Sequence, residues 1–402
     1  MLKTLTKSQP DISWSNNAEI LSVYADMNSE SWHLGLINTL DNSNFQNAIS
    51  TLAKNAVVPN PFFDLPILQA AEKNLDSKKV CYLYLSKKSG NEDNLKFFAA
   101  VQLSSIGIFR HKVLRTWNHP YAPLGMPLVA KNDSNETLKA LIECIQVANH
   151  PSASAIVFEH IAREGSFIND LYRSCHLSDR LLFAGGITRA ALKPIKNLDY
   201  IGTHFSGKRK QRLRKAKTEL EKLGSVTFSS ASDSKSIKTP LKEFLALEQS
   251  GWKGKKKTAL KDSLATETFC REAVSSMTAQ NRCHIHSLKS DDKTIASLVT
   301  FESQGYYYPW KIAFDEKYAK YSVGNLLSTH ATAEFANNTN FKGLDSLAAE
   351  YNQTTLRYWP DQKEFFTMII GIGKTANQTT LKITNEINRI KRIKTTIRNL
   401  LK

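Results

Sequence analysis

The order of the apolar segments in the second half of the chain constrains the fold most. Helical spacing and strand-like runs predict, in order, a strand at 226–229, helices at 241–252 and 264–277, strands at 283–288, 295–301 and 306–314, a helix ending near 336, and strands at 343–347 and 365–372. A doubly wound dinucleotide fold would alternate strand and helix strictly. This order instead predicts an α/β fold with a mixed, mostly antiparallel sheet flanked by helices.

The first half repeats this order more loosely. It reads as helices at 45–56 and 65–75, strands at 80–85, 97–103 and 113–117, a helix at 136–148, a strand at 155–158, a short helix at 167–175 and a strand at 181–183. We interpret the two halves as an internal duplication. The predicted modules are residues 1–200 and 201–375, followed by a helix at 376–402.

The net charge of the chain limits the classes of molecule that it is expected to bind. The 402 residues carry 54 basic and 37 acidic side chains, a formal net charge of +17. This excess favours nucleotide cofactors, nucleic acid or an acidic membrane face. The five cysteines are odd in number and widely spaced, and no segment reaches the apolar length of a membrane span, so the sequence predicts a cytoplasmic protein.

An aromatic strand and a glycine turn precede the helix that ends near residue 336. A helix starting at 322–326 would direct unpaired backbone N–H groups and the positive end of its dipole at an anion. The same residues also describe an ordinary strand, turn and capped helix. The element order around the turn favours a phosphate site.

A basic helix is predicted between the two halves. Residues 206–224 combine a leucine and alanine stripe with many lysines and arginines, and Gly224 ends the helix. Its basic face, including Lys208 and Arg212, would hold a polyanionic substrate or cofactor. The alternative is a solvated helix that packs its apolar stripe on the second module.

Three segments in a fixed order resemble a known family. They are the basic stretch at 208–214, the Phe-Leu-Ala-Leu-Glu-Gln-Ser-Gly-Trp-Lys-Gly segment at 244–254 and the Tyr-Ser-Val-Gly-Asn-Leu-Leu turn at 321–327. Together they resemble the CelD-like acyltransferases of the GNAT superfamily, which are associated with cellulose biosynthesis. The resemblance covers residues 200–350 closely and the upstream part more loosely. Fem-type peptidyltransferases, which are similar in architecture, also carry two GNAT-like modules.

The resemblance implies transfer of an acyl group from acyl-CoA to an amine or hydroxyl. The pantetheine arm would run along the strand edge at Lys311, Ile312, Ala313 and Phe314, where the fourth and fifth strands separate. The pyrophosphate would rest on the start of the following helix. The residues expected at that helix start are Ser322, Val323, Gly324, Asn325 and Leu326. The first module would be a degenerate copy.

Acyl transfer needs a base for the acceptor, an oxyanion site and a proton for the thiolate. The candidate proton carriers are Glu302, Lys311 and Tyr351, although a strand-end acid, a solvated lysine and a packed aromatic are the structural alternatives. Trp252 and Lys253 would bind the acceptor from the loop after the first helix, unless Trp252 only anchors the helix end. The histidines show no metal-ligand spacing, so no metal is expected.

The C-terminal segment 381–402 alternates isoleucines with basic residues and contains one acid, Glu386. It predicts a helix that either lies on an anionic membrane or docks on the protein by its isoleucine stripe.

The leading hypothesis is an acyl-CoA-dependent N- or O-acyltransferase acting on a saccharide or envelope precursor. The alternatives are a Fem-type transferase using aminoacyl-tRNA, and a non-catalytic GNAT-like module that binds nucleic acid or membrane. Nucleic acid is the less favoured partner.

Overall fold

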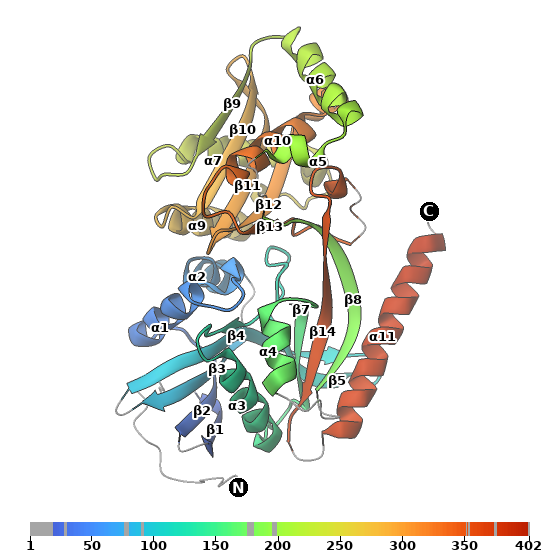
Figure 1. The fold of residues 1–402 in the computed structure, drawn as a ribbon. Helices are drawn as coiled ribbons and strands as arrows, with labels where there is room; N and C mark the ends of the chain where they lie inside the picture. The colour runs from blue at the N-terminus through green and yellow to red at the C-terminus, as the bar shows by residue number, and fades with distance from the viewer. Residues whose placement is uncertain are drawn as a thin grey trace. The chain divides into compact units, whose positions relative to one another are not determined.

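The computed structural model describes residues 19–27, 30–75, 80–89, 92–174, 181–194, 199–350, 352, 354–373 and 376–400. The chain forms two compact units, drawn in Figure 1. Unit 1 comprises residues 1–65, 77–187 and 364–402, and unit 2 comprises residues 66–76 and 188–363. Strands β8 (Leu181–Leu192) and β14 (Asp361–Gly371) begin in one unit and end in the other.

Unit 1 is a mixed sheet with helices packed on it. Its elements are β1 (Glu19–Met27), β2 (Glu30–Ile37), α1 (Ser43–Lys54), η1 (Pro61–Phe63), β3 (Val80–Ser89), β4 (Glu92–Ile106), β5 (His111–Thr116), β6 (Leu128–Val129), α3 (Ser134–Val147), β7 (Ala155–Ala162), α4 (Ser166–Ser174) and α11 (Asn377–Leu400). The strand order is β1-β2-β3-β4-β5-β7-β14-β8, with β6 paired to β4. The sequence interpretation did not include β1 and β2.

Unit 2 repeats this plan. Its elements are α2 (Leu65–Asn74), α5 (Tyr200–His204), α6 (Gly207–Glu221), β9 (Val226–Ala231), α7 (Lys238–Ser250), α8 (Trp252–Lys255), η2 (Leu260–Asp262), α9 (Leu264–Thr278), β10 (Cys283–Ser290), β11 (Lys293–Ser303), β12 (Tyr306–Phe314), η3 (Glu316–Tyr321), α10 (Val323–Ala336), β13 (Gly343–Asp345) and η4 (Thr355–Arg357). The strand order is β8-β13-β12-β11-β10-β9.

The two units share one order of elements. Three antiparallel strands, a helix and a parallel strand follow one another as β3-β4-β5-α3-β7 in unit 1 and as β10-β11-β12-α10-β13 in unit 2. The prediction of a mixed α/β fold in which one order of elements occurs twice is therefore confirmed. The last strand differs from the sequence interpretation, because β14 pairs with β7 of unit 1 through Phe365 and Ala162.

Helix packing explains the basic helix and the C-terminal helix. Leu220 of α6 is buried in the core of unit 2, and Leu213 and Ala216 pack against that core. Ile383 of α11 is buried in a core of unit 1, and Ile387 packs beside it. The apolar stripe of α6 therefore docks on unit 2, and the first part of the α11 stripe docks on unit 1.

Candidate functional site

Strand β12 separates from its parallel neighbour after a short contact. It pairs with β13 at Tyr306–Gly343 and Tyr307–Leu344, and the described residues of the two strands show no further pair. On its other side β12 pairs with β11 as far as Phe314. The second half of β12 therefore presents one backbone edge to a ligand, at the residues where the resemblance places the pantetheine arm.

A β-bulge in β12 decides which side chains face which layer. Lys311 pairs with Val299 and Pro309 pairs with Thr300, so Trp310 is an extra residue in the register of β12 with β11. A bulge bends the strand and interrupts the regular alternation of side chains, and a proline within a strand is tolerated at such a site. Before the bulge, Tyr307 stacks on Phe335 of α10 at 4.2 Å between ring centroids.

Beyond the bulge the side chains alternate regularly again, but the even-numbered residues of β12 now face α10 instead of the odd-numbered ones. Ile312 and Phe314 pack with the α10 core, and a Cβ at Gly324 would lie 3.7 Å and 3.6 Å from their side chains. Lys311 points to the opposite layer, where its Nζ lies 3.9 Å from Glu248 of α7. The bulge thus gives one strand segment an apolar face toward α10 and a lysine toward α7.

The start of α10 is open to a ligand. Its N-cap residue, Ser322, has a left-handed backbone with φ 54°, and its side chain does not cap the helix. The first helical turn also contains no acidic residue. Uncapped N–H groups at a helix start, together with the positive end of the helix dipole, bind anions.

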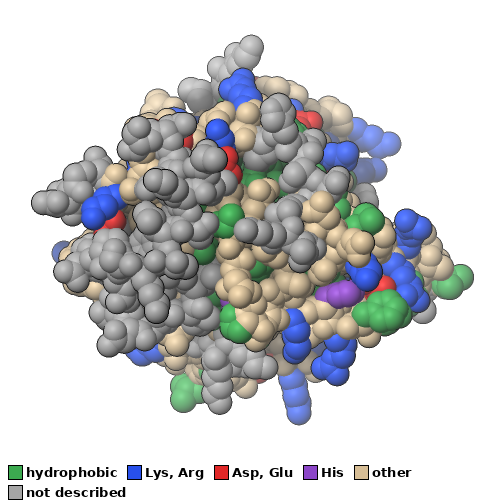
Figure 2. All heavy atoms as spheres, turned by 90° about the horizontal axis from the view of Figure 1, so that it is seen from below, with side chains coloured by type: hydrophobic (Ala, Val, Ile, Leu, Met, Phe, Trp, Pro, Cys, Tyr) green, Lys and Arg blue, Asp and Glu red, His purple; other side chains and the backbone are tan. Residues whose placement is uncertain are grey.

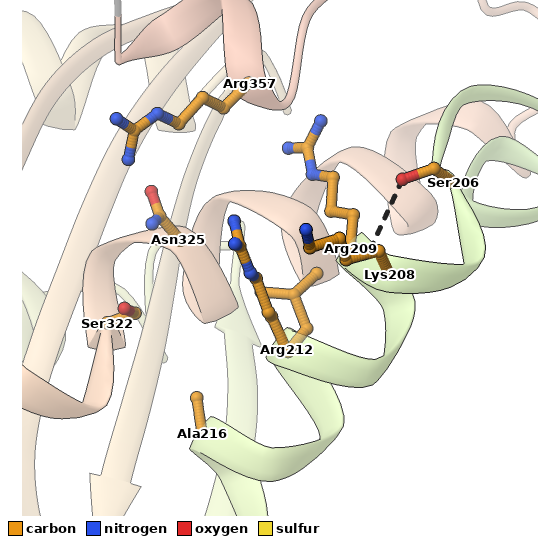
Figure 3. Close-up of a pocket in the computed structure, with 9 residues that line it drawn as sticks. Ser206, Lys208, Arg209, Arg212, Ala216, Ser322, Asn325 and Arg357 are labelled. Carbon is orange, nitrogen blue, oxygen red and sulfur yellow. Dashed lines mark hydrogen bonds between the residues drawn. The ribbon is translucent and has the colours of Figure 1, made fainter.

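A cavity of about 530 Å³ lies at this helix start (Figure 3). Its charged lining is entirely basic, and Arg212 and Arg357 extend toward the first turn of α10 from α6 and η4. Arginine binds phosphate through paired N–H donors and keeps its charge at neutral pH. The lining residues are Ser206, Lys208, Arg209, Arg212, Leu213, Ala216, Ser322, Asn325 and Arg357.

The cavity combines residues that the sequence interpretation kept apart. Lys208 and Arg212 were expected at the substrate, and the structure places them beside Ser322 and Asn325 of the expected phosphate turn. Arg209 was not singled out, although its spacing of three from Arg212 places the two on one helix face. Its guanidinium lies 3.7 Å from the ring centroid of Phe205, which holds it in place.

No sequence pattern indicated that Arg357 lies at this cavity. It lies in a three-residue helix well separated along the chain from α6 and α10. The Tyr200 hydroxyl of α5 donates a hydrogen bond to the carbonyl of the neighbouring Tyr358, which ties η4 to α5. Only the folded chain brings Arg357 to the cavity.

A buried carboxylate with two lysines lies on the other face of β12. Glu248 is 2% exposed, accepts the Lys253 ammonium at 2.6 Å and accepts the Leu260 N–H at 2.8 Å. Lys311 is the second lysine. Glu248 was not a candidate, although an acid at a core position of a predicted amphipathic helix was a usable signal.

Burial controls the protonation of Lys311. Its side chain is 15% exposed, and burial lowers its pKa to about 8, with the charge of Lys253 acting in the same direction and Glu248 opposing it. A lysine with this pKa exchanges its proton near neutral pH. Perturbed groups of this kind are enriched at functional sites.

The Trp252 loop closes over the same strand. A small cavity of about 30 Å³ is lined by Trp252, Lys253 and Glu248 on one side and by residues 312–314 of β12 on the other. Trp252 is 53% exposed, and the Lys256 Nζ lies 5.4 Å from its ring centroid. The expected acceptor residues therefore lie beside the expected donor edge.

Glu302 occupies a different position. Its carboxylate accepts the Gly305 N–H and closes the turn between β11 and β12. Glu302 pairs with Tyr307, four residues along β12 from Lys311, which is about 13 Å at the rise of a strand. Glu302 thus serves the turn, away from the lysine pair. Tyr351 lies outside the described residues.

The corresponding helix start in unit 1 is acidic. Asp133 precedes α3 and pairs with Lys96 at 2.6 Å, and Glu136 in the first turn pairs with Lys87 at 3.1 Å. These carboxylates already compensate the positive end of the helix dipole. The start of α3 therefore disfavours phosphate.

The strand separation in unit 1 is filled by the chain itself. Strands β5 and β7 pair at Leu114–Ile156 and Arg115–Val157. Just beyond, Glu159 accepts hydrogen bonds from Arg115 and, at 2.7 Å, from Asn118. A Cβ at Gly125 would lie 2.4 Å from the Glu159 carbonyl oxygen, so the segment packs directly on β7.

The described residues contain neither a group of metal ligands nor a helix that could span a membrane. In the part of the chain that the structure describes, no three His, Cys, Asp or Glu side chains are grouped as metal ligands. Within the same residues, every helix is too short or too polar to cross a membrane.

Comparison with known proteins identifies the domain. Residues 207–358 match the acetyltransferase (GNAT) domain, a range that contains the whole cavity lining except Ser206. This part of the chain is a GNAT acetyltransferase domain, and the chain is an acyltransferase. No curated protein sequence matched the chain.

Two solved structures share the fold of both units. FemX aligns with a TM-score of 0.54 at 9% identity, covering 84% of this chain and 98% of its own. The C-terminal DUF2156 domain of a protein described as a lysylphosphatidylglycerol synthetase from Agrobacterium fabrum aligns with a TM-score of 0.51 at 9% identity, covering 85% and 95%. At such identities these structures show similarity of fold alone.

Proposed function

We propose that the chain transfers an acyl group from acyl-CoA to an amine or hydroxyl. One observation carries the proposal: the cavity at the start of α10, whose charged lining residues are all basic and whose helix has no side-chain cap. Ser322, Asn325, Arg212 and Arg357 would bind the phosphates of CoA, and the pantetheine arm would follow residues 311–314.

Lys311 is the proposed proton carrier. In its neutral form it takes the proton of the acceptor as the nucleophile attacks the thioester carbonyl. The oxyanion is stabilised by backbone N–H groups of β12. When the C–S bond breaks, the Lys311 ammonium returns a proton to the thiolate, so the group is restored in each turnover. Burial lowers the pKa of Lys311, and the charges of Lys253 and Glu248 adjust it further.

The acceptor is proposed to bind at the Trp252 loop. A tryptophan with neighbouring lysines suits a saccharide or an envelope precursor that bears phosphate, as in the CelD-like group. The basic C-terminal helix would keep a cytoplasmic enzyme at an anionic membrane where such an acceptor is held.

Thermal-shift titration tests the donor site. Acetyl-CoA and longer acyl-CoAs should raise the melting temperature, because a ligand that binds the native state stabilises it. The Arg212→Gln and Arg357→Gln variants should lose most of the shift, whereas Lys88→Gln, on β3 in unit 1, should keep it. Absence of a shift with wild-type protein at millimolar acetyl-CoA would refute the proposal.

A second donor is favoured by one observation. The basic face of α6 fits an aminoacyl-tRNA, the donor of the Fem-type alternative, whose phosphates would also use Arg209 and Arg212. Transfer of a labelled amino acid from tRNA, with no stabilisation by acyl-CoA, would replace the acyl-CoA proposal with this one.

A further inference from the structure

The turn between β4 and β5 exposes two adjacent apolar side chains. Ile108 is 66% exposed and Phe109 is 73% exposed at the tip of this hairpin. Arg110 and Lys112 follow them directly and are also exposed. An apolar tip with basic neighbours has the chemistry of a segment that inserts between anionic lipid headgroups.

Helix α11 lies beside this turn. The Ile108 N–H donates to Glu386 Oε2 at 3.2 Å. A Cβ at Gly107 would lie 2.5 Å from the same oxygen, and Gly107 has φ +73°. The helix therefore approaches the turn closely and fixes its position within unit 1.

This contact removes the only acid of α11 from the exposed face. Glu386 is 8% exposed and lies 3.6 Å from Arg389. The remaining charged side chains of the helix are all basic: Lys382, Arg389, Lys391, Arg392, Lys394 and Arg398. In Figure 2, Lys and Arg side chains gather on the side where α11 lies in Figure 1, with apolar side chains among them.

The apolar stripe of α11 continues past the docked part. Ile383 is fully buried, whereas Ile393, Ile397 and Leu400 are 48%, 51% and 80% exposed. At about 3.6 residues per turn, Ile397 lies about 40° around the helix from Ile383, and Ile393 and Leu400 lie about 80° and about 100° from it on the same side. The first half of the helix thus docks on unit 1 through Ile383, and the second half presents apolar side chains to solvent.

We propose that the β4–β5 turn and the distal half of α11 form one docking surface for an anionic lipid bilayer. The charge is complementary to such a surface, and the apolar side chains are placed among the basic ones, as interfacial binding requires. The surface contains no residue of the donor site, so it holds whether or not the donor is acyl-CoA.

Vesicle sedimentation of the full chain tests the proposal. Wild-type protein should sediment with phosphatidylcholine vesicles that contain about 30 mol % phosphatidylglycerol and remain in solution with pure phosphatidylcholine. The double variants I108S/F109S and I393S/I397S should each bind at least about tenfold more weakly. Leu264→Ser is the matched control, because Leu264 is 83% exposed in unit 2 and should not contribute.

The salt dependence of vesicle binding distinguishes the contribution of the basic side chains from that of the apolar side chains. Raising salt from about 0.1 to about 0.5 M should weaken wild-type binding strongly and R392Q/K394Q binding less. Three results would overturn the proposal: no binding of wild-type protein to anionic vesicles, equal binding by the double variants, or a concentration-dependent dimer abolished by I393S/I397S without vesicle binding. The acetyl-CoA thermal shift should be unchanged in all these variants, which separates lipid binding from the donor site.

Discussion

Replacement of Lys311 by methionine should stabilise unit 2 at neutral pH and remove activity. The pKa of Lys311 is lowered from an ordinary 10.5 to about 8 in the folded chain. A difference of about 2.5 pKa units corresponds to about 3 kcal/mol, which the folded state loses at pH 7 by keeping a charged ammonium in a buried site. Methionine fills a similar volume without this cost.

The stability difference between the wild type and Lys311→Met should depend on pH. Because the folded pKa is depressed, the unfolded chain binds more protons between pH 8 and 10.5, and wild-type stability rises with pH across this window. The advantage of Lys311→Met should therefore fall from about 3 kcal/mol at pH 7 to about 1 kcal/mol at pH 10. Other titrating groups cancel in the difference between the two proteins.

Urea denaturation of both proteins at pH 7 and pH 10 measures this difference. The midpoints should separate at pH 7 and converge at pH 10 with unchanged slopes. The rate of acyl transfer by the wild type should rise with an apparent pKa near 8, as expected for a base of that pKa. A less stable Lys311→Met protein at pH 7, or a difference independent of pH, would refute the assignment of Lys311 as a buried, destabilised ammonium.

Three further variants test other parts of the site. Asn325→Asp places a carboxylate in the donor cavity at the start of α10, so acetyl-CoA affinity should fall about tenfold while the melting temperature is kept or raised by the helix dipole; titration calorimetry and thermal melts measure both. Glu248→Gln removes the charge that supports protonation of Lys311, so the midpoint of the pH–rate profile should move below 8. An unchanged midpoint would show that Glu248 does not influence the protonation of Lys311. Gly343→Ala should destabilise unit 2 by about 1–3 kcal/mol, because its φ is +143° and a Cβ would lie 2.9 Å from the Leu192 carbonyl oxygen; chemical denaturation measures this loss.

The element order was predictable because apolar periodicity reports it directly. The three antiparallel strands, the helix and the parallel strand appear in each half where the runs predicted them. Strands β1 and β2 were missed, since their pairing with each other and the pairing of β2 with β3, rather than a distinctive local pattern, define them. The pairing of β14 with β7 also lay beyond the sequence, because a last apolar run does not show which module it joins.

Only the part of the candidate site that lies within one short segment of the chain could be predicted from the sequence. The start of α10 follows from a strand, a turn and a helix in sequence, so residues 322–326 could be singled out. Arg357 and Glu248 come from separate elements, and their approach to the site depends on tertiary packing. The bulge at Trp310 was equally hidden, because a register shift exists only between two paired strands.

The two modules show how one topology supports two different roles. In both, a strand separates from its parallel neighbour after two pairs, which opens a gap in the sheet. In unit 1, the chain fills the gap around Glu159, and acids occupy the start of α3. In unit 2, the described residues of β12 pair with β13 no further than Tyr307, and the start of α10 carries no acid and faces arginines. Because carboxylates at a helix start compete with a bound phosphate, these differences favour unit 2 over unit 1 as the place of the proposed donor site.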